Sequence, residues 1–456
     1  MSPSEQQQVP EGYKVTEAGV IPEDWDIKLL SEVCNKITDG THDTPKPVIT
    51  GVPFLTAIHV KENKIDFEGC YYLPKDVHDE IYRRCNPERN DVLMVNIGAG
   101  VATSALVNVD YEFSLKNVAL IKPNKSKLLG QYLNYYQSYV KYKVFESLSS
   151  GGAQPFLSLF QIGQLKASLP PIEEQTAIAD ALSDVDGLIG SLEKLITKKR
   201  AIKTAAMQQL LTGKKRLPPF CTGTCLSGDA MDGKEPIDQT HTGYKQTDLG
   251  EIPNDWEIDS IGRVLSITTG DKNTQDKVGD GQYPFFVRSQ TIERINSYSF
   301  DGEAVLTAGD GVGTGKIFHY INGKFDYHQR VYLMHNFCNR LDGYYFYIYF
   351  SNNFYDRIMS MTAKSSVDSV RREMIADMKI VMPPIDEQIE ISKALTDMDK
   401  DIEALEQRLN KTQQLKQGMM QELLTGRTRL VKSRGELRVR RKKAVDREKQ
   451  LRVESE

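Results

Sequence analysis

The sequence predicts an α+β protein: two β-rich variable domains with helical inserts, separated by two long helices that pair as a coiled coil. Two observations predict this fold. The chain repeats itself, and each copy of the repeat ends in a long stretch with an apolar seam of helical period. A repeat of more than 200 residues indicates duplicated domains, not a solenoid of short units. The fold should therefore have an internal pseudo-two-fold repeat.

Three parts of the sequence carry the duplication. GYKVTEAGVIPEDWDI at 12–27 returns as GYKQTDLGEIPNDWEI at 243–258, 231 positions later, with the only two tryptophans in register. LPPIEEQTAIADALSDVDGLI opens a stretch at 169–217 that aligns without a gap on 382–430, 213 positions later. The same displacement of 213 places Gly98 on Gly311 and Tyr136 on Tyr349, so the variable regions are diverged copies. The first copy is about 18 residues longer, the difference between the two displacements.

These matches divide the chain into six parts. In order they are a lead segment with the first variable domain (1–168), a long helix (169–217), a linker (218–242), a second lead segment with the second variable domain (243–381), a second long helix (382–430) and a basic charged tail (431–456). The linker is rich in Gly, Pro and small polar residues. The tail reads either as a solvated helix or disordered segment, or as an arm that seeks phosphates.

Each long helix is predicted from its pattern. Pro170 and Pro171 end the preceding strand, and Glu173 and Glu174 suit the positive N-terminus of a helix. The apolar residues then alternate steps of four and three, the period of coiled-coil packing. The helix-pairing residues are Ile178, Leu182, Val185, Ile189, Leu192 and Ile196 in the first copy and Ile391, Leu395, Met398, Ile402, Leu405 and Leu409 in the second.

Gly213 and Gly426 supply the C-terminal stop of these helices. A helix from about Glu173 to Leu211 would be roughly 60 Å long. Two equal seams in one chain most simply pack on each other, and the alternative is that each helix packs only on its own domain.

The variable domains are predicted to be β-rich. DVLMVNIGAG, SALVNV and NVALIKP in the first copy, and EAVLTAG, GKIFHYI and QRVYLMH in the second, have strand character. YLNYYQSYVKYKVFESL and YYFYIYFSNNFYDRIM predict short helices with an aromatic face. Such aromatics could stack on bases, although at helical spacing they more often belong to the core.

Composition and motifs argue against several classes of protein. No stretch is apolar enough for a membrane span and no signal sequence precedes the first domain, so we expect a cytoplasmic protein. The net charge of −4 gives no sign of nucleic-acid binding by itself. Six scattered cysteines suit a reducing compartment, and Cys221 and Cys225 are expected to be free thiols, since no second ligand pair has zinc-site spacing.

Two short motifs imitate catalytic sites and lack their essential residues. The PPI after Leu169 and Met382 lacks the amide and aromatic groups that an amino-methyltransferase uses on a flipped base. GDGVGTGK at 309–316 has the wrong glycine spacing for a phosphate-binding loop and has Ile317 in place of Ser or Thr, so a hairpin is expected instead. We therefore predict no catalytic residue and no metal site.

The lead segments, the PPIEEQ helices and their QQLLTG endings resemble the specificity (S) subunit of Type I restriction-modification systems, over nearly the whole chain. ITDGTHDTPKP at 37–47 and GQYPFFVRSQTI at 281–292 each resemble a recurring class of target-recognition domain. The resemblance implies a non-catalytic DNA-specificity subunit whose two domains each read one half of a bipartite, asymmetric site in double-stranded DNA.

The resemblance also implies partners. The paired helices would set the spacing and dock two methyltransferase (modification) subunits, and motor-nuclease (restriction) subunits would complete the enzyme. S-adenosylmethionine, ATP and magnesium would then belong to the partners, with no cofactor in this chain and no membrane contact. Two weak readers joined rigidly gain effective concentration for the second half-site.

Base contacts are chosen here by chemistry, because Asn, Gln and Arg can make bidentate contacts with base edges. Any one of these residues could equally stabilise a loop. The DNA-binding candidates are Thr38, Asp39, Thr41, His42, Lys46, Asn96, Lys116 and Asn117 in the first domain, and Asp271, Lys272, Asn273, Arg288, Gln290, Lys316, Gln329 and Arg330 in the second.

Two other functions remain open from the sequence. One is a two-headed coiled-coil scaffold that binds protein or glycan ligands, which would show no salt-dependent DNA binding. The other is a self-sufficient DNA-modifying enzyme, which the missing catalytic and cofactor motifs disfavour.

Overall fold

The computed structural model describes residues 9–431 except 18, 99, 149–155, 219, 221–242 and 362–368. Cys221, Cys225 and the basic tail lie outside the described residues. The chain forms two compact units, Met1–Glu193 with Gln407–Glu456 (unit 1) and Lys194–Glu406 (unit 2). Within the described ranges, no helix is long and apolar enough to cross a membrane.

Unit 1 contains the first variable domain. Strands β10-β9-β12-β4 form a four-stranded sheet and β11-β5-β8 a three-stranded sheet. In chain order the elements are β1 (Tyr13–Thr16), β2 (Gly19–Pro22), β3 (Asp26–Leu29), α1 (Leu30–Val33), β4 (Cys34–Asp39), β5 (Val52–Leu55), η1 (Ala57–His59), β6 (Val60–Lys61), β7 (Lys64–Ile65), β8 (Tyr71–Leu73), α2 (Lys75–Cys85), β9 (Val92–Val95), β10 (Ser104–Leu106), β11 (Ser114–Leu115), β12 (Val118–Pro123), α3 (Gly130–Leu148), α4 (Leu159–Gln164) and β13 (Lys166–Leu169).

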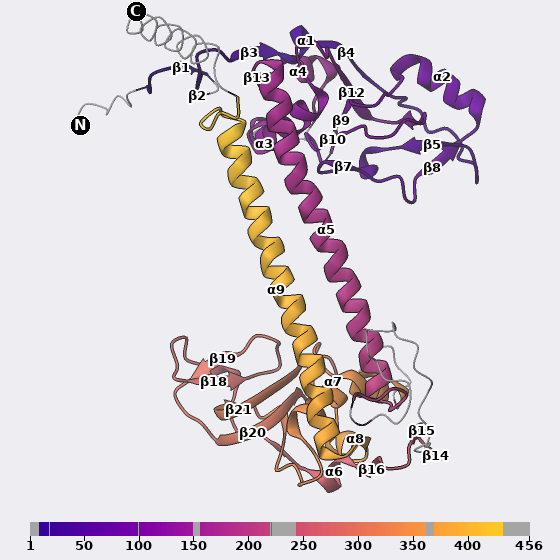
Figure 1. Ribbon diagram of the computed structural model, residues 1–456, viewed down its shortest axis with the longest axis vertical. Coiled ribbons are helices and arrows are strands. Elements are labelled where there is room, and N and C mark those ends of the chain that lie inside the picture. The colour runs from indigo at the N-terminus through magenta and orange to yellow at the C-terminus, as the bar shows by residue number, and fades with distance from the viewer. Residues whose placement is uncertain are drawn as a thin grey trace, which may run out of the picture. The chain divides into compact units, whose positions relative to one another are not determined.

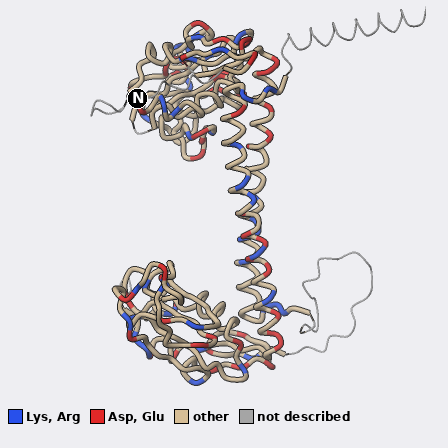
Figure 2. The backbone as a smooth tube through the Cα atoms, turned by 90° about the vertical axis from the view of Figure 1, so that its left-hand side faces the viewer, with Lys and Arg blue, Asp and Glu red and all other residues tan. Residues whose placement is uncertain are grey.

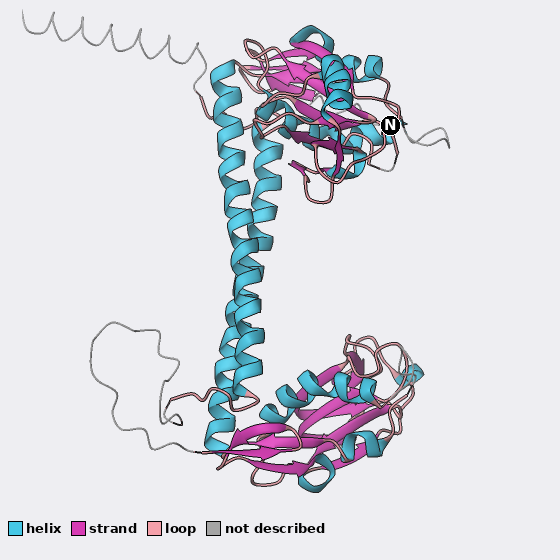
Figure 3. Cartoon of the chain, turned by 90° about the vertical axis from the view of Figure 1, so that its right-hand side faces the viewer, coloured by secondary structure: helices cyan, strands magenta, loops and turns pink. Residues whose placement is uncertain are grey.

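Unit 2 repeats this plan with a simpler sheet. Its six strands join as β17-β22-β20-β21-β18-β19, with helices packed against the sheet (Figure 3). The elements are β14 (Tyr244–Thr247), β15 (Gly250–Pro253), β16 (Glu257–Ser260), α6 (Ile261–Val264), β17 (Ser266–Thr269), η3 (Thr274–Asp276), β18 (Tyr283–Phe286), β19 (Glu293–Ile295), β20 (Phe300–Ala308), β21 (Phe318–Tyr327), β22 (Val331–His335), α7 (Gly343–Ser360), α8 (Arg372–Ala376) and β23 (Lys379–Met382). The first domain has the 11-residue helix α2 within its extra length.

The duplication extends to backbone conformation. Gly98 and Gly311 have φ angles of 89° and 88°, and Gly213 and Gly426 both have 70°. β20 pairs antiparallel with β21 on either side of residues 309–316, so the hairpin expected there is confirmed. The aromatic helices α3 and α7 have 19 and 18 residues, so they are longer than the short helices expected. Most of their aromatic rings lie in the cores, as expected from the helical spacing.

The two long helices α5 (Ile172–Leu210) and α9 (Ile385–Leu423) are paired side by side and antiparallel (Figure 1). In unit 1, Asp186 of α5 forms an ion pair of 2.7 Å with Lys416 of α9. In unit 2, Lys199 pairs with Asp401 at 3.0 Å. Lys, Arg, Asp and Glu follow one another along both helices, as Figure 2 shows.

The predicted seam residues are buried or half-buried along both helices. The first turns of each helix also pack on their own domain. Ile178 and Leu182 belong to the core of unit 1, where they meet Leu423 and Leu424 at the end of α9. The alternatives left open by the sequence are thus both realised, at different positions along one helix.

Each unit contains a largely buried cluster of one Arg, one Glu, one Asp and one Trp side chain, which we call the clamp. The two clamps are equivalent in the repeat. In unit 2, the Arg216 guanidinium donates to Glu387 (Nε–Oε1 2.8 Å) and to Asp255, and Trp256 Nε1 donates to the same Glu387 at 3.0 Å. In unit 1, Arg429 donates to Glu174 and Asp24, and Trp25 Nε1 donates to Glu174 at 3.1 Å. Each arginine follows one long helix, and each glutamate begins the other.

From its position, Glu174 is expected only to interact favourably with the helix dipole. The structure shows more than that, because its side chain is 1% exposed and is held by the arginine and tryptophan of the clamp. The hydrogen bond to Glu387 raises the pKa of the Arg216 guanidinium and outweighs the opposing effect of burial. The Arg216 guanidinium therefore stays charged where it meets the buried carboxyl group of Glu387.

One prediction concerns the seam. Leu192 is 4% exposed, whereas Leu188, four residues earlier on α5, is 40% exposed. We expect Leu192→Ala to lower the free energy of unfolding by about 2–5 kcal/mol, because it leaves a cavity. Leu188→Ala should change stability by roughly 0.5 kcal/mol or less. Chemical denaturation of both variants tests this, and equal midpoints would contradict it.

Candidate nucleic-acid interface

Both variable domains join two loops where an early strand of the sheet ends. In unit 1, residues 38–42 at the end of β4 meet residues 115–117, which we call the first loop pair: Thr41 N–H donates to the Leu115 carbonyl at 2.9 Å. In unit 2, residues 269–273 after β17 meet residues 328–330, the second loop pair: Gln329 N–H donates to the Lys272 carbonyl at 2.8 Å. A backbone hydrogen bond therefore joins an early loop to a later loop in both copies of the repeat.

A glycine makes each close approach possible. A Cβ atom on Gly40 would lie 1.8 Å from the Leu115 carbonyl oxygen, and one on Gly270 would lie 2.0 Å from the Tyr327 carbonyl oxygen. Both distances are far inside contact range and both clashes are with backbone, which cannot rotate away. Only glycine lets the two loops of each pair touch.

Side chains of the first loop pair hold one another in place. His42 Nδ1 lies 2.9 Å from Asn117 Oδ1, and its Nε2 lies 3.2 Å from Asp39 Oδ2. Lys116 Nζ donates to the Thr44 hydroxyl. Asp39 is buried and also accepts from the Arg84 guanidinium. The exposed surface of this cluster is formed mainly by His42, with Lys116 and Asn117 half-buried beside it.

Arg330 belongs to the second loop pair, and Arg288 and Asp310 lie beside it. Asp310 lies between two exposed guanidinium groups, with Arg288 at 2.7 Å and Arg330 at 3.3 Å. The amide of Gln329 donates to Asn273 Oδ1 at 2.6 Å. Arginine fixed by a carboxylate keeps the planar donor fork that suits guanine.

The buried side chain of His328 stabilises the backbone of this cluster. Burial, with Arg288 adding to it, lowers the pKa of His328 below its usual value. The imidazole is therefore neutral at pH 7, and its Nδ1 accepts the backbone N–H of Arg330 at 2.9 Å. That bond fixes the turn from which the Arg330 side chain projects.

The remaining candidates lie in different surroundings. Thr38 and Asn96 are buried, at 8% and 5% exposure, and no partner for Asn96 Oδ1 lies among the described residues. Lys46, Asp271 and Gln290 are exposed on loops. Lys316 is also exposed, with its ammonium group 5.2 Å from the centre of the Tyr355 ring.

Comparison with known proteins places this architecture in a family. The family model for the Type I restriction modification DNA specificity domain matches residues 22–203 and again 253–416, one match per copy of the repeat. The chain belongs to this family. It is a DNA-specificity subunit of the Type I restriction-modification kind, a non-catalytic component with two target-recognition domains, as the resemblance implied.

Relatives and a solved structure agree over most of the chain. It is 25% identical to the type I restriction enzyme MjaX specificity subunit of Methanocaldococcus jannaschii, over 92% of this chain and 97% of the relative. It is 24% identical to the MjaVIII specificity subunit of the same organism, over 92% and 96%. The crystal structure of the Type I restriction-modification S subunit from M. genitalium has the same fold, with a TM-score of 0.56 at 12% identity, over 90% of this chain and 97% of that one.

Reading the sequence of this specificity subunit missed the residues that organise the candidate interface. Gly40, Gly270, Asp310 and His328 hold the loop pairs, and none of them was among the candidates. The glycines could have been found, because ITDG at 37–40 and ITTG at 267–270 stand at matching places in the two copies. Asp310 leaves no comparable signal, since its partners Arg288 and Arg330 are distant in sequence, and His328 bonds to the backbone of Arg330, which a sequence pattern does not show.

Proposed function

We propose that each target-recognition domain reads one half of a bipartite, asymmetric DNA site through its loop pair. The observation that carries this is the duplicated glycine-to-carbonyl contact, which brings exposed polar and cationic side chains together in both domains. In the first domain, His42, Lys46, Lys116 and Asn117 are the contacts that we favour, with Asp39 as their support. In the second, Arg288, Gln329 and Arg330 are favoured.

The other site residues take supporting roles in this proposal. Thr38 and Asn96 are buried and would stabilise the loops, whereas Thr41, Lys272 and Asn273 supply the backbone and amide bonds that join them. Asp271, Gln290 and Lys316 lie at exposed positions from which they could reach the DNA backbone or base edges. Phosphate contacts would fix the register, and the base contacts would carry the sequence.

We further propose that the paired helices α5 and α9 set the spacing of the half-sites and dock two methyltransferase subunits, with motor-nuclease subunits completing the enzyme in the cytoplasm. S-adenosylmethionine, ATP and magnesium would be bound by those partners. The helices carry exposed charged side chains on the faces away from the seam, which suits a polar interface. The chain's own charge of −4 leaves phosphate neutralisation largely to the partners.

Domain exchange tests the proposal. Asp259 of β16 and Ile380 of β23 are partners in one ladder, so residues 259–380 can be replaced by those of a related subunit without breaking the strand pair. We expect the hybrid to change one half of the methylated sequence and to keep the other half. Genome-wide mapping of methylated bases, with the partner methyltransferase present, measures this.

The matched control exchanges residues 28–167, which end on the ladder partners Lys28 and Ala167. This hybrid should change only the opposite half. Hybrids in which both halves change together would refute the assignment of one half-site to each domain.

A further inference from the structure

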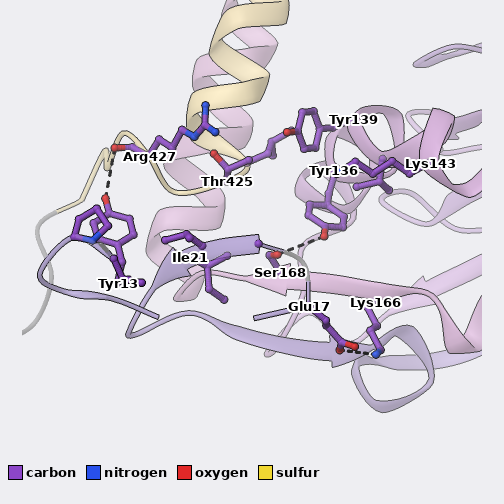
Figure 4. Close-up of a pocket in the computed structure, with 16 residues that line it drawn as sticks. Tyr13, Glu17, Ile21, Tyr136, Tyr139, Lys143, Lys166, Ser168, Thr425 and Arg427 are labelled. Carbon is purple, nitrogen blue, oxygen red and sulfur yellow. Dashed lines mark hydrogen bonds and ion pairs between the residues drawn. The ribbon is translucent and has the colours of Figure 1, made fainter. Parts of the chain in front are cut away.

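Unit 1 contains a cavity of about 1100 Å³ away from the loop pairs. Its walls come from the β1–β2 hairpin, α3, β13 and the turn after α9 (Figure 4). In Figure 4, Tyr139 of α3 points toward Thr425, and the Tyr136 hydroxyl points to Ser168 of β13. The Tyr13 hydroxyl donates to the Gly426 carbonyl at 2.9 Å, which fixes the hairpin against the turn.

The lining combines apolar walls with a cationic rim. Val9 and Val20 are 40% and 39% exposed, which is high for aliphatic side chains beside a cavity. Lys166 is neutralised by an ion pair with Glu17. Lys143 and Arg427 are exposed, and neither has an ion-pair partner among the described residues. The cavity thus offers apolar contact together with two free positive charges.

The second copy of the repeat lacks this chemistry. The Tyr132 and Tyr345 hydroxyls donate to the Ser168 and Val381 carbonyls at 2.8 and 2.9 Å, so α3 and α7 occupy equivalent places. In that register α7 carries Asn352, Asn353 and Asp356 where α3 carries Tyr139, Val140 and Lys143, and Glu251 replaces Val20 in the hairpin.

The residues at these equivalent positions differ between the two units, which helps to distinguish side chains needed for folding from side chains available for binding. Unit 2 packs the equivalent helix, hairpin and strand with two amides and two carboxylates in place of the aromatic, aliphatic and basic side chains. Unit 2 therefore folds without an aromatic, aliphatic or basic side chain at the positions equivalent to Tyr139, Val140 and Lys143. An apolar cavity bordered by two cations without ion-pair partners among the described residues is complementary to a ligand that carries both apolar and acidic groups.

We propose that this cavity binds an acidic, amphipathic peptide segment of a protein partner, one per chain. Aliphatic side chains of the segment would enter between Val20 and Tyr139, and its carboxylates would pair with Lys143 and Arg427. A nucleic-acid backbone would use the two cations and leave the apolar walls without a contact. Both units have a loop pair for the DNA reading proposed above, whereas only unit 1 has this cavity chemistry. The peptide site would therefore be a separate function, present once in a subunit that is otherwise duplicated.

A labelled peptide provides the test. The probe is a fluorescein-labelled octapeptide of alternating Leu and Glu, titrated with the full chain and followed by anisotropy. We expect one site per chain, and binding at least about tenfold weaker for the matching Leu-Lys peptide, because the rim repels its charges. The variant Tyr139→Asn/Val140→Asn/Lys143→Asp, which copies the second unit, should bind the Leu-Glu probe about tenfold more weakly or worse.

The reciprocal variant is the matched control. Asn352→Tyr/Asn353→Val/Asp356→Lys with Glu251→Val should raise the stoichiometry from one peptide to two. Both variants carry residues that already occur at equivalent places in this chain, and circular dichroism checks that they fold.

Three results would overturn the proposal: equal affinity for the acidic and basic peptides, unchanged affinity in the first variant, or displacement of the probe by inorganic phosphate or a DNA duplex. Methylation mapping of the first variant keeps this test separate from the function proposed above. An unchanged methylated sequence alongside lost peptide binding is the expected combination.

Discussion

Glu387→Ala is expected to lower the free energy of unfolding by about 3–5 kcal/mol, because it leaves a buried arginine without its main partner. The Glu387 side chain is 0% exposed and the Arg216 side chain only 7%. Both guanidinium bonds to Glu387 and the indole bond of Trp256 are lost together. Asp255, which is 41% exposed, remains as a weaker partner. Chemical denaturation of the full chain measures the loss.

Three variants sharpen this experiment. Asp255→Ala should cost about 1 kcal/mol or less, because that carboxylate is largely in water. Arg216→Met combined with Glu387→Leu should recover much of the stability, since neither charge is then buried alone. Glu174→Ala should cost less than Glu387→Ala, because the Arg429 side chain is 21% exposed and water can solvate it. A loss below about 1 kcal/mol for Glu387→Ala would contradict a stabilising clamp.

Gly270→Ala is expected to abolish discrimination at the second half-site, with a loss of about 10- to 100-fold in affinity for the cognate sequence. The added Cβ would lie 2.0 Å from the Tyr327 carbonyl oxygen and must push the loop pair apart. Bidentate base contacts are worth about 1–3 kcal/mol each and fail when their donors move. Binding to DNA altered in one half-site at a time, at fixed salt, measures the effect.

Gly279→Ala is the matched control for this variant. A Cβ atom there meets nothing within 4 Å and the backbone φ is not left-handed, so we expect no change in binding. Gly40→Ala should impair the first half-site only. If Gly270→Ala weakened both half-sites equally, the glycine would matter for folding as a whole and the loop-pair proposal would fail.

The long helices could be predicted from sequence because their signal is local and repeated. A 3.5-residue period over several turns, written twice, fixes both the element and its partner face, and the seam residues are indeed buried or half-buried. The strands of the second domain could also be predicted. In VYLMH and EAVLTA the apolar residues either alternate with polar ones or form a short continuous run between turns. Such features depend on neighbours a few residues apart.

The loop pairs and clamps could not be predicted in this way. Gly40 meets Leu115 and Arg429 meets Glu174 across 75 and 255 positions, so no periodicity links them. Helix α2 was missed because KDVHDEIYRRC is mostly polar and is held by only three buried residues, His78, Ile81 and Cys85. The internal repeat was the one long-range signal available, and it placed the two tryptophans and the two LTG endings in register without revealing that they touch.

The position of the clamps has a consequence for inheritance. All eight clamp residues, Asp24, Trp25, Glu174 and Arg429 in one unit and Arg216, Asp255, Trp256 and Glu387 in the other, lie outside 28–167 and 259–380. Genetic recombination at these boundaries would therefore exchange a whole reader and leave both clamps unaltered. Two crossovers, one at each boundary, could give a lineage a new target sequence in one half of the site. What the subunit reads could then change while the residues that clamp each unit stay the same.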